Sequence, residues 1–591
     1  MTHAIHKLPR QPVPPLADTL DGCMSSVSPV LNGLQRLKSK LIFELCGASQ
    51  AKRQKRLLAL KREQPTNWFA AGLTHLWLSS RGGLPFCNNY VLLLEDDPLA
   101  ESLTGRAARL IVAALNLHQH VSAQALAPDV AGDMPLEMDQ YRRCFATHRR
   151  PRWHSDEVVT IAGSHHVAVL LNGQVYCMAV DLQCGTNSLH AIQQALDHIV
   201  GSADAVNDND MAPGMLSALP RDQWAQCRGE LLKDGQNQQT LSLLEKALFV
   251  VCLDTAAAPG SLSGISVTLR DGNSHNRFYD KSMQIIVMGN GKAGLCFERA
   301  AVDGSVALGF AARLQRESLK LPAAGDEASR QQPAIRTRAA AWSLSASLKQ
   351  HLRAAKKYIS EAQQQRGIET WVSPNIGARR FKALDISPDA VAQLAIQIAV
   401  GEVTGQTPNI FEPVQIRHFA GGRMDFIMPV TDESLAAARS LRDPSANRYL
   451  TAAQIRRAAK AHQGLVLRTK NGRGLVAHLL ALNAMQEGSA NRKGAGIYSW
   501  RHTALSHLDK GLQVLLRQDV LAANGSGFFG VISFGPIAPR PNMLSIGYLI
   551  KEDEITFDLR ADGRFSAHAR AVRAALQQAL AAIEKALAEG K

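Results

Sequence analysis

The feature that most constrains the fold is a glycine-rich turn, GNGKAG at residues 289–294, set between two apolar runs. Its spacing matches the G-x-G-x-x-G turn that binds dinucleotides. That turn opens a helix, however, whereas here LCFE follows at residues 295–298. Asn290 and Gly291 both tolerate a positive φ, as the tight turn of a β-hairpin requires. The sequence therefore predicts two antiparallel strands here and no dinucleotide site.

A second hairpin signal and several amphipathic runs indicate the fold class. Asn172-Gly173 lies between two apolar runs within residues 166–180, and the segments 528–539 and 542–550 are typical of strands. Residues 320–340 are polar and weakly patterned, which is typical of a linker. Helices with one buried face are predicted within residues 16–60, 107–117, 390–400 and 564–588. Mixed helices and hairpins in both halves of the chain predict an α/β or α+β fold.

Length and charge bound the number of units and the class of partner. The chain has 591 residues, 46% of them apolar, so it can bury large cores and is expected to form two or more units. Its formal net charge of +15 favours polyanionic partners, among them nucleotide-bearing cofactors and acidic carrier proteins. No Lys/Arg run is long enough for a nucleic-acid tail, so we expect no nucleic acid among the partners.

The cysteines and the N-terminus indicate the compartment. The nine cysteines are odd in number, scattered and without a C-x-x-C pair, which favours reduced thiols. The first residues contain no apolar stretch typical of a signal peptide, and no run of about 18 apolar residues occurs. We therefore expect a cytoplasmic protein that does not associate with a membrane.

Motifs for common catalytic centres are missing from the sequence. The pairs His118/His120 and His165/His166 have no acidic or cysteine residue near them at a ligand spacing, so no metal site is expected. Neither a G-x-S-x-G elbow nor a P-loop occurs, which argues against a serine hydrolase or NTPase of the usual kinds.

Seven blocks in one order along the chain resemble a known family. The most specific is NRFYDKSMQIIVMGNGKAGLCFERAAVDG at residues 276–304, and PLEMDQYRRCFATHRRP, ALFVVCLD and SPDAVAQLAIQIA are further examples. The others are the segments 8–20, 166–176 and 214–231. Together they resemble the choline/carnitine acyltransferase family over nearly the whole chain.

The resemblance implies a fold and a domain organisation. It implies two chloramphenicol-acetyltransferase-like domains, each a mixed sheet covered by helices, with the site in a tunnel between them. Residues 1–20 and 91–340 would form the N-type domain, and residues 21–90 and 341–591 the C-type domain. Clefts between domains are common ligand sites.

The resemblance also places a substitution at the centre of the site. Where the family has the histidine that takes the proton from the acceptor hydroxyl, this chain has Arg299, and Asp303 stands at the acidic residue that orients the histidine. Arginine stays protonated, so it cannot act as that base. The i, i+4 spacing predicts an ion pair between Arg299 and Asp303. We consider two bases in its place, His275 and His418.

The residues implied for the acceptor pocket differ from the carnitine enzymes. Phe411 replaces a tyrosine, Met424 and Phe426 replace two threonines, and Ala477 replaces the arginine that binds carnitine's carboxylate. Losing that charge-assisted bond would cost roughly 1.5 to 3 kcal/mol. Carnitine is therefore not expected as the acceptor.

The donor side is less changed. Ala378 replaces one of two lysines that contact the 3′-phosphate of coenzyme A, while Lys382 retains the other and Arg379 and Arg380 are placed to compensate. Asp389 of the SPDA block is expected beside the cofactor. The S-T-S motif of the family aligns near Ala522-Ala523-Asn524, with Ser526 close by. Ile532 aligns with the residue that limits acyl length, and its size favours a short acyl group.

Two functions remain open at this point. The first is transfer of a short acyl group from a thioester of coenzyme A, or of an acidic acyl carrier protein, to a small alcohol or amine other than carnitine, with no tightly bound cofactor. The alternative is a catalytically disabled family member that acts as a binding or interaction protein. An Arg299 side chain locked to Asp303 and filling the tunnel would favour the alternative, and one facing open space would favour altered chemistry.

Overall fold

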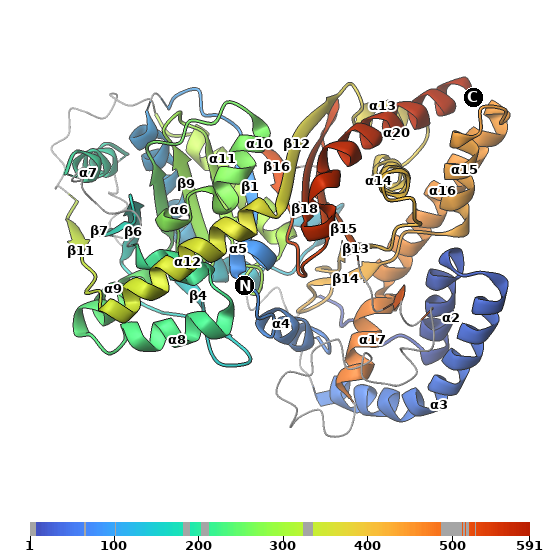
Figure 1. Ribbon diagram of the computed structural model, residues 1–591, viewed down its shortest axis with the longest axis horizontal. Coiled ribbons are helices and arrows are strands. Elements are labelled where there is room, and N and C mark those ends of the chain that lie inside the picture. The colour runs from blue at the N-terminus through green and yellow to red at the C-terminus, as the bar shows by residue number, and fades with distance from the viewer. Residues whose placement is uncertain are drawn as a thin grey trace.

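The structure, a computed structural model, contains two β-sheets side by side, each with helices packed against it (Figure 1). It describes residues 8–63, 67–100, 102–180, 189–202, 212–322, 335–485, 511, 514–515, 519–525 and 528–590, with the backbone alone for residues 45–49. The predicted mixed α/β architecture with two helix-covered sheets is confirmed.

The eight-stranded sheet is a mixed sheet. Its strand order is β11 (Thr337–Ala340), β7 (Gln174–Ala179), β6 (His166–Leu171), β8 (Val250–Asp254), β9 (Met283–Met288), β10 (Ala293–Phe297), β1 (Tyr90–Leu94) and β16 (Val531–Gly535). The pairs β6–β8 and β8–β9 are parallel, and the other pairs are antiparallel. The two predicted hairpins are present as β6–β7 and β9–β10, with Gly173 and Gly291 at positive φ in their turns.

The six-stranded sheet is mixed as well. Its order is β12 (Arg366–Pro374), β18 (Glu554–Asp562), β17 (Leu544–Ile550), β15 (Val520–Asn524), β13 (Ile410–Gln415) and β14 (Met424–Ile427). β15 is parallel to both β13 and β17. Two small hairpins complete the strands: β2 (Val130–Ala131) with β3 (Met134–Pro135), and β4 (Thr147–Arg150) with β5 (Glu157–Thr160).

Helices cover the sheets and form a lobe beside them. Those near the eight-stranded sheet include α6 (Leu103–Ser122), α7 (Leu189–Ser202), α8 (Arg221–Leu231), α9 (Gly235–Lys246), α11 (Gly304–Leu319), α12 (Ala346–Gln364) and the short α5 (Leu84–Cys87). Those on the side of the six-stranded sheet include α13 (Ala378–Ala383), α14 (Pro388–Thr404), α16 (Arg448–Arg468) and α20 (Ala569–Glu589), and α15 (Asp432–Arg442) packs on α16. The lobe contains α2 (Leu16–Val27), α3 (Gly33–Glu63) and α17 (Leu475–Ala484), with α4 (Ala70–Leu78) beside it and α10 (Leu262–Val267) between the sheets.

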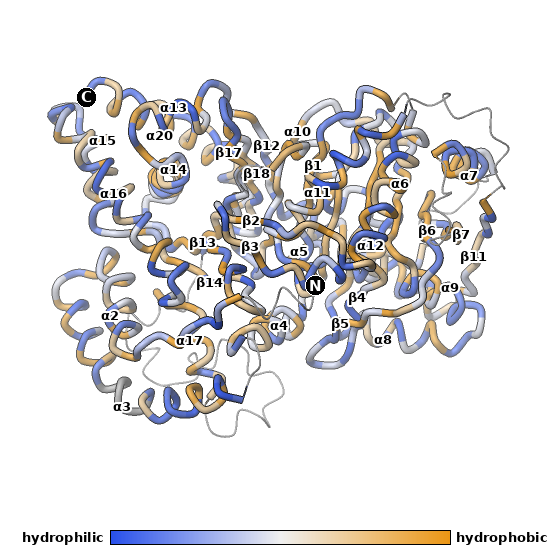
Figure 2. Tube along the Cα trace, turned by 180° about the vertical axis from the view of Figure 1, so that it is seen from behind, coloured by the Kyte–Doolittle hydropathy of each residue, from blue (hydrophilic) through white to orange (hydrophobic). Residues whose placement is uncertain are grey.

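Three large apolar cores explain the packing on the two sheets, and a fourth, smaller one holds α2 and α3 together in the lobe. One lies under α6 and α11 and extends to the facing strands of the six-stranded sheet, and Figure 2 shows the hydrophobic residues along α6. A second lies on the other face of the eight-stranded sheet, under α8 and α12, and a third lies under α14 and α20. Within the described residues, no helix is both long enough and apolar enough to cross a membrane.

One strand joins the two sheets. β16 pairs with β1 in the eight-stranded sheet, although β15 and β17, its neighbours in sequence, belong to the six-stranded sheet. The segment predicted as a linker, 320–340, contributes the edge strand β11, while its residues 323–334 lie outside the described part of the chain. The exact domain boundaries stay a prediction.

Candidate functional site

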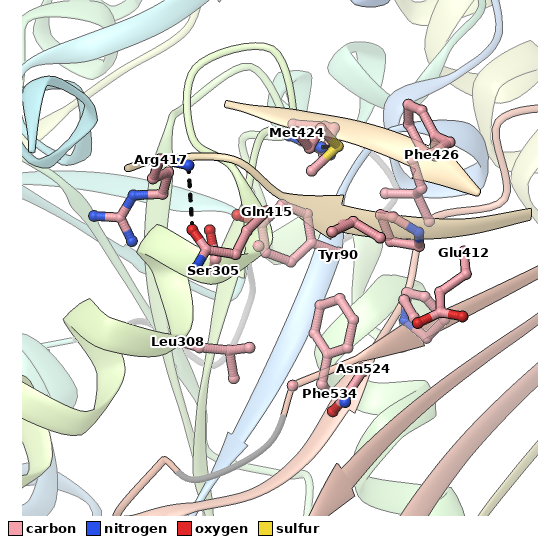
Figure 3. Close-up of a pocket in the computed structure, with 18 of the residues that line it drawn as sticks. Tyr90, Ser305, Leu308, Glu412, Gln415, Arg417, Met424, Phe426, Asn524 and Phe534 are labelled. Carbon is pink, nitrogen blue, oxygen red and sulfur yellow. Dashed lines mark hydrogen bonds between the residues drawn. The ribbon is translucent and has the colours of Figure 1, made fainter. Parts of the chain in front are cut away.

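A cavity of about 770 Å³ lies between the two sheets, with walls from both (Figure 3). β1 and α11 form one side, and β13 and β14 form the other. Its apolar lining combines many aliphatic side chains with six aromatic ones, namely Trp77, Tyr90, Phe411, Phe426, Phe528 and Phe534. This size and lining are typical of a site for a small molecule.

Arg299 lies in the cavity wall, in the turn between β10 and α11. Its Nη1 donates to a carboxylate oxygen of Asp303, so the ion pair expected from the spacing is present. Its Nη2 lies 2.9 Å from the sulfur of Met424, and the guanidinium carbon lies 4.8 Å from the ring centre of Trp77. The side chain is bound to Asp303, yet the space beside it stays open.

A second arginine holds the same carboxylate. Arg423 donates to the two oxygens of Asp303 from Nε at 2.9 Å and Nη2 at 2.7 Å, and Gln140 donates at 2.8 Å. Burial alone would raise the pKa of Asp303, but the guanidinium groups of Arg423 and Arg299 hold it well below its usual range. Two guanidinium groups therefore share one carboxylate, which leaves one excess positive charge beside the cavity.

The residues expected to form the acceptor pocket are partly brought together. Phe411, Met424 and Phe426 line the cavity, and the rings of Phe411 and Phe426 lie 6.2 Å apart. Ala477 is fully buried behind the wall, where its N–H donates to Asp425 at 2.8 Å. Its neighbours on α17, Val476 and Leu480, line the cavity in its place, so this part of the wall is apolar.

The residues expected on the donor side lie on α13 and α14. On the surface of α13, Arg379 pairs with Glu552 at 3.1 Å and Asp553 at 2.5 Å, and the Nε of Arg380 donates to Glu584 at 2.7 Å. Lys382 is exposed and has no ion pair among the described residues.

Asp389, the second residue of α14, lines the cavity. It accepts hydrogen bonds from Asn524 at 2.6 Å and Tyr548 at 2.8 Å. Asn524 and Ala523, from the segment aligned with the S-T-S motif, line the cavity too, whereas Ser526 lies outside the described residues.

Ile532 is placed away from the cavity. It belongs to β16, where side chains alternate between the two faces, and it packs into the core under α8 and α12. Phe534, two residues further on, points to the cavity face and lies 6.0 Å from the ring of Tyr90. The side chain of β16 that faces the cavity is therefore Phe534 and not Ile532.

The structure reveals a buried pair that sequence reasoning missed. The Nε2 of His462, on α16, lies 2.7 Å from Oε2 of Glu412, on β13, and Glu412 lines the cavity. Burial raises the pKa of Glu412 to about 7, although His462 opposes the shift. Burial would lower the pKa of His462, but the Glu412 carboxylate raises it. The two residues are 50 positions apart, and no local sequence signal marks the pair.

The histidines considered as substitute bases lie elsewhere. His418 bonds the carbonyl of Lys470 at 2.7 Å, and neither His418 nor His275 lines the cavity. Across the described ranges, no histidine is among the residues of its wall. Glu412 and Asp389 are thus the carboxylates at this end of the cavity, and Asp129 is paired with Arg313 and Arg417.

Comparison with known proteins adds independent observations. A family model described as "Choline/Carnitine o-acyltransferase" matches residues 11–578. Carnitine O-palmitoyltransferase 2 of Rattus norvegicus is 28% identical over 94% of this chain and 88% of its own. Choline O-acetyltransferase of Danio rerio is 26% identical over 80% of this chain and 78% of its own. Among solved structures, the trichothecene 15-O-acetyltransferase TRI3 of Fusarium sporotrichioides has 10% identity and a TM-score of 0.41, covering 87% of this chain and 94% of its own.

Proposed function

Because the chain belongs to the choline/carnitine acyltransferase family, we propose that it transfers a short acyl group from a thioester of coenzyme A to a small acceptor other than carnitine. The single observation that carries the proposal is the open cavity beside Arg299. A cavity of about 770 Å³ with walls of aliphatic and aromatic side chains leaves room for both reactants. Arg299 forms part of its wall and does not fill it.

Arg299 is suited to bind an anionic oxygen. Among the described residues, the contact of its Nη2 is the sulfur of Met424, and a thioether is a weak acceptor. An oxygen anion in the cavity would compete well for that N–H. The excess charge of the cluster formed by Arg299, Asp303 and Arg423 favours the same ligand, since electrostatic interactions are strong in a buried site.

The apolar part of the cavity wall beside Ala477 argues against carnitine as the acceptor. The arginine that the family resemblance associates with carnitine's carboxylate is Ala477 here, and Ala477 is buried. Val476 and Leu480 present apolar surface beside it. A carboxylate at this point would lose water without gaining a charged partner, which is unfavourable by about 1 to 3 kcal/mol or more.

The surface around α13 is compatible with a phosphate-bearing donor. Lys382 is exposed, and Arg379 and Arg380 are held by carboxylates only in exposed ion pairs. Such pairs contribute about 0 to 1 kcal/mol, so a phosphate can replace the carboxylates at little cost in free energy. A donor on an acidic carrier protein would meet the same charges.

The alternative, a non-catalytic binding protein, has one observation in its favour. Arg299 cannot accept a proton, and it is bonded to Asp303. That arrangement resembles a structural ion pair in the place of a catalytic dyad. The alternative predicts tight ligand binding without turnover.

Mass spectrometry of reaction products separates the two functions. Wild type, Arg299→Ala and Arg299→His would be incubated with acetyl-CoA and a pool of alcohols and amines, and CoA binding would be measured by calorimetry in parallel. We expect product from wild type and a large loss in Arg299→Ala with CoA binding retained. Binding without product in wild type, and product only in Arg299→His, would instead establish the disabled form.

A further inference from the structure

A buried polar cluster lies between the six-stranded sheet and the helices α14 and α16 (Figure 1). Glu412 of β13 and Asn524 of β15 alternate in phase with Ile410 and Ala522, which belong to the core under α14. Their side chains therefore point to the helices, on the face of the sheet opposite Phe411. The cluster is thus a separate feature of the molecule, built between the helices and the sheet.

Three side chains in this cluster bring metal-ligating atoms together. One oxygen of Asp389, one oxygen of Glu412 and one ring nitrogen of His462 all lie within 4.8 Å of one another. Atoms bound to one Zn²⁺ at about 2 Å lie about 3.3 Å apart in a tetrahedron, so shifts of about 1 Å bring these three to a common ion. When no ion is bound, a hydrogen bond of 2.7 Å joins His462 to Glu412.

The negative charge of the cluster has no arginine or lysine to balance it. Asp254 and Asp558 are also buried carboxylates, and each pairs with a buried arginine. Among the described residues, by contrast, the ion pair formed by Asp389 and Glu412 is the one between Glu412 and His462. Two carboxylates and one imidazole leave a negative charge uncompensated when both acids are ionised. Because such a charge is costly away from water, the cluster favours a bound cation.

Buried amide oxygens around the cluster lack hydrogen-bond donors. Gln393 follows Asp389 by one turn of α14, and its Nε2 donates to the hydroxyl of Tyr548 at 2.9 Å. Its Oε1 is buried without a partner in the described part of the chain, and so is Oδ1 of Asn524. Nearly all buried oxygens accept a hydrogen bond. A surplus of acceptors favours a cation whose bound water can donate to these oxygens.

We infer that Asp389, Glu412 and His462 bind one divalent transition-metal ion, of which Zn²⁺ is the type. An imidazole nitrogen beside carboxylate oxygens suits such ions, whereas Mg²⁺ and Ca²⁺ prefer oxygen ligands alone. Three protein ligands leave a fourth position on the ion. Asp389 and Glu412 line the cavity, so this position can hold a water or an oxygen atom of a molecule bound there.

The neighbours of Asp389 suit a metal ligand. Asn524 donates to its Oδ1 at 2.6 Å, and the hydroxyl of Tyr548 donates to the same oxygen at 2.8 Å. Both bonds fall on Oδ1, so Oδ2 can face the ion. Partners of this kind orient a ligand and strengthen metal binding. The ion would also join α14, β13 and α16, so it should stabilise the fold.

The first test measures metal content. The full chain is stripped with EDTA, incubated with Zn²⁺, passed through gel filtration and analysed by mass spectrometry for zinc. We expect wild type to keep one Zn²⁺ per chain. Asn524→Ala should weaken the affinity about 10- to 100-fold, and Glu412→Gln and His462→Gln should weaken it more. The control Glu433→Gln/His190→Gln changes two exposed residues and should bind zinc as wild type does.

Co²⁺ distinguishes this site from the cysteines of the chain. With nitrogen and oxygen ligands, Co²⁺ should give visible absorption bands without a thiolate-to-cobalt band in the near ultraviolet. These bands should be absent from His462→Gln. Zn²⁺ should also raise the unfolding temperature of wild type, since it binds the folded chain. Circular dichroism checks that each variant is folded, and the wild-type zinc content and cobalt spectrum decide the question if a variant is not.

The contrary outcomes are separate from those of the acyl-transfer assay. Zinc lost from wild type on gel filtration, zinc kept equally by Glu412→Gln and His462→Gln, or a thiolate band with Co²⁺ overturns the inference. The cluster would then be a hydrogen-bonded pair without a metal. None of these measurements depends on acyl transfer, so the failure of the proposed function would leave the metal site standing.

Discussion

Arg423 donates two hydrogen bonds, of 2.9 and 2.7 Å, to the carboxylate of Asp303, the same carboxylate that Arg299 contacts. Asp303 is therefore anchored by the residue that precedes β14 of the six-stranded sheet, while its own position follows β10 of the eight-stranded sheet. The ion pair links the two halves of the protein at the cavity. Because Arg423 is the main partner of Asp303, the positive charge of Arg299 is available to a ligand.

Removing the two arginines should therefore have unequal effects on stability. Arg423→Ala takes away both bonds to Asp303 and a third to Thr74 at 2.8 Å, so it should lower the free energy of unfolding by about 3 kcal/mol or more. Arg299→Ala leaves Asp303 with Arg423 and should cost about 1 to 2 kcal/mol. Chemical denaturation of both variants measures the difference. Equal costs would contradict this and show that Arg299 contributes as much to stability as Arg423 does.

The pair Glu412–His462 should make stability fall as pH rises. Both groups have pKa values raised by folding, so each holds its proton more tightly in the folded chain. Their contribution is fully present at about pH 4 and is lost as pH increases through about 7. The expected slope is up to about 1.4 kcal/mol per pH unit.

Denaturation of wild type and of the double variant Glu412→Gln/His462→Gln between pH 5 and 8 measures this slope. In the double variant the free energy of unfolding should depend less on pH. The control Glu433→Gln/His190→Gln, which changes two exposed residues, should show the same slope as wild type. A slope that persists in the double variant would assign it to other groups.

The acyl group should be limited by Phe534 and not by Ile532. Phe534 faces the cavity and packs on Tyr90, so Phe534→Leu opens space where a longer acyl chain can extend. Wild type and variant would be compared with acyl-CoA donors of increasing length, and we expect the optimum to move to longer chains at a stability cost of about 1 to 3 kcal/mol. Ile532→Val is the matched control, since it alters the opposite face and should leave chain-length preference unchanged.

Local patterns account for the parts of the fold that the sequence predicted. The hairpins at Gly173 and Gly291 depend on short-range turn chemistry, and the ion pair of Arg299 with Asp303 depends on a spacing of four residues. The orientation of Ile532 away from the cavity and the pairing of Glu412 with His462 depend on long-range packing. β16 leaves its sequence neighbours for the other sheet, and α16 approaches β13 only in the folded chain. No local sequence pattern predicts either arrangement.

The donor side gives a last prediction, on Lys382. If this exposed lysine meets the 3′-phosphate of coenzyme A, Lys382→Ala should weaken CoA binding about 3- to 10-fold and leave binding of dephospho-CoA unchanged. Calorimetry at low and high salt measures both ligands, and the difference between them should shrink at high salt because the contact is exposed. Lys349→Ala, on the exposed surface of α12, is the matched control. If the binding of CoA and of dephospho-CoA were weakened equally, Lys382 would contact another part of the donor. Arg379 and Arg380 would then be the residues that bind the phosphate, and it would have to displace their carboxylate partners.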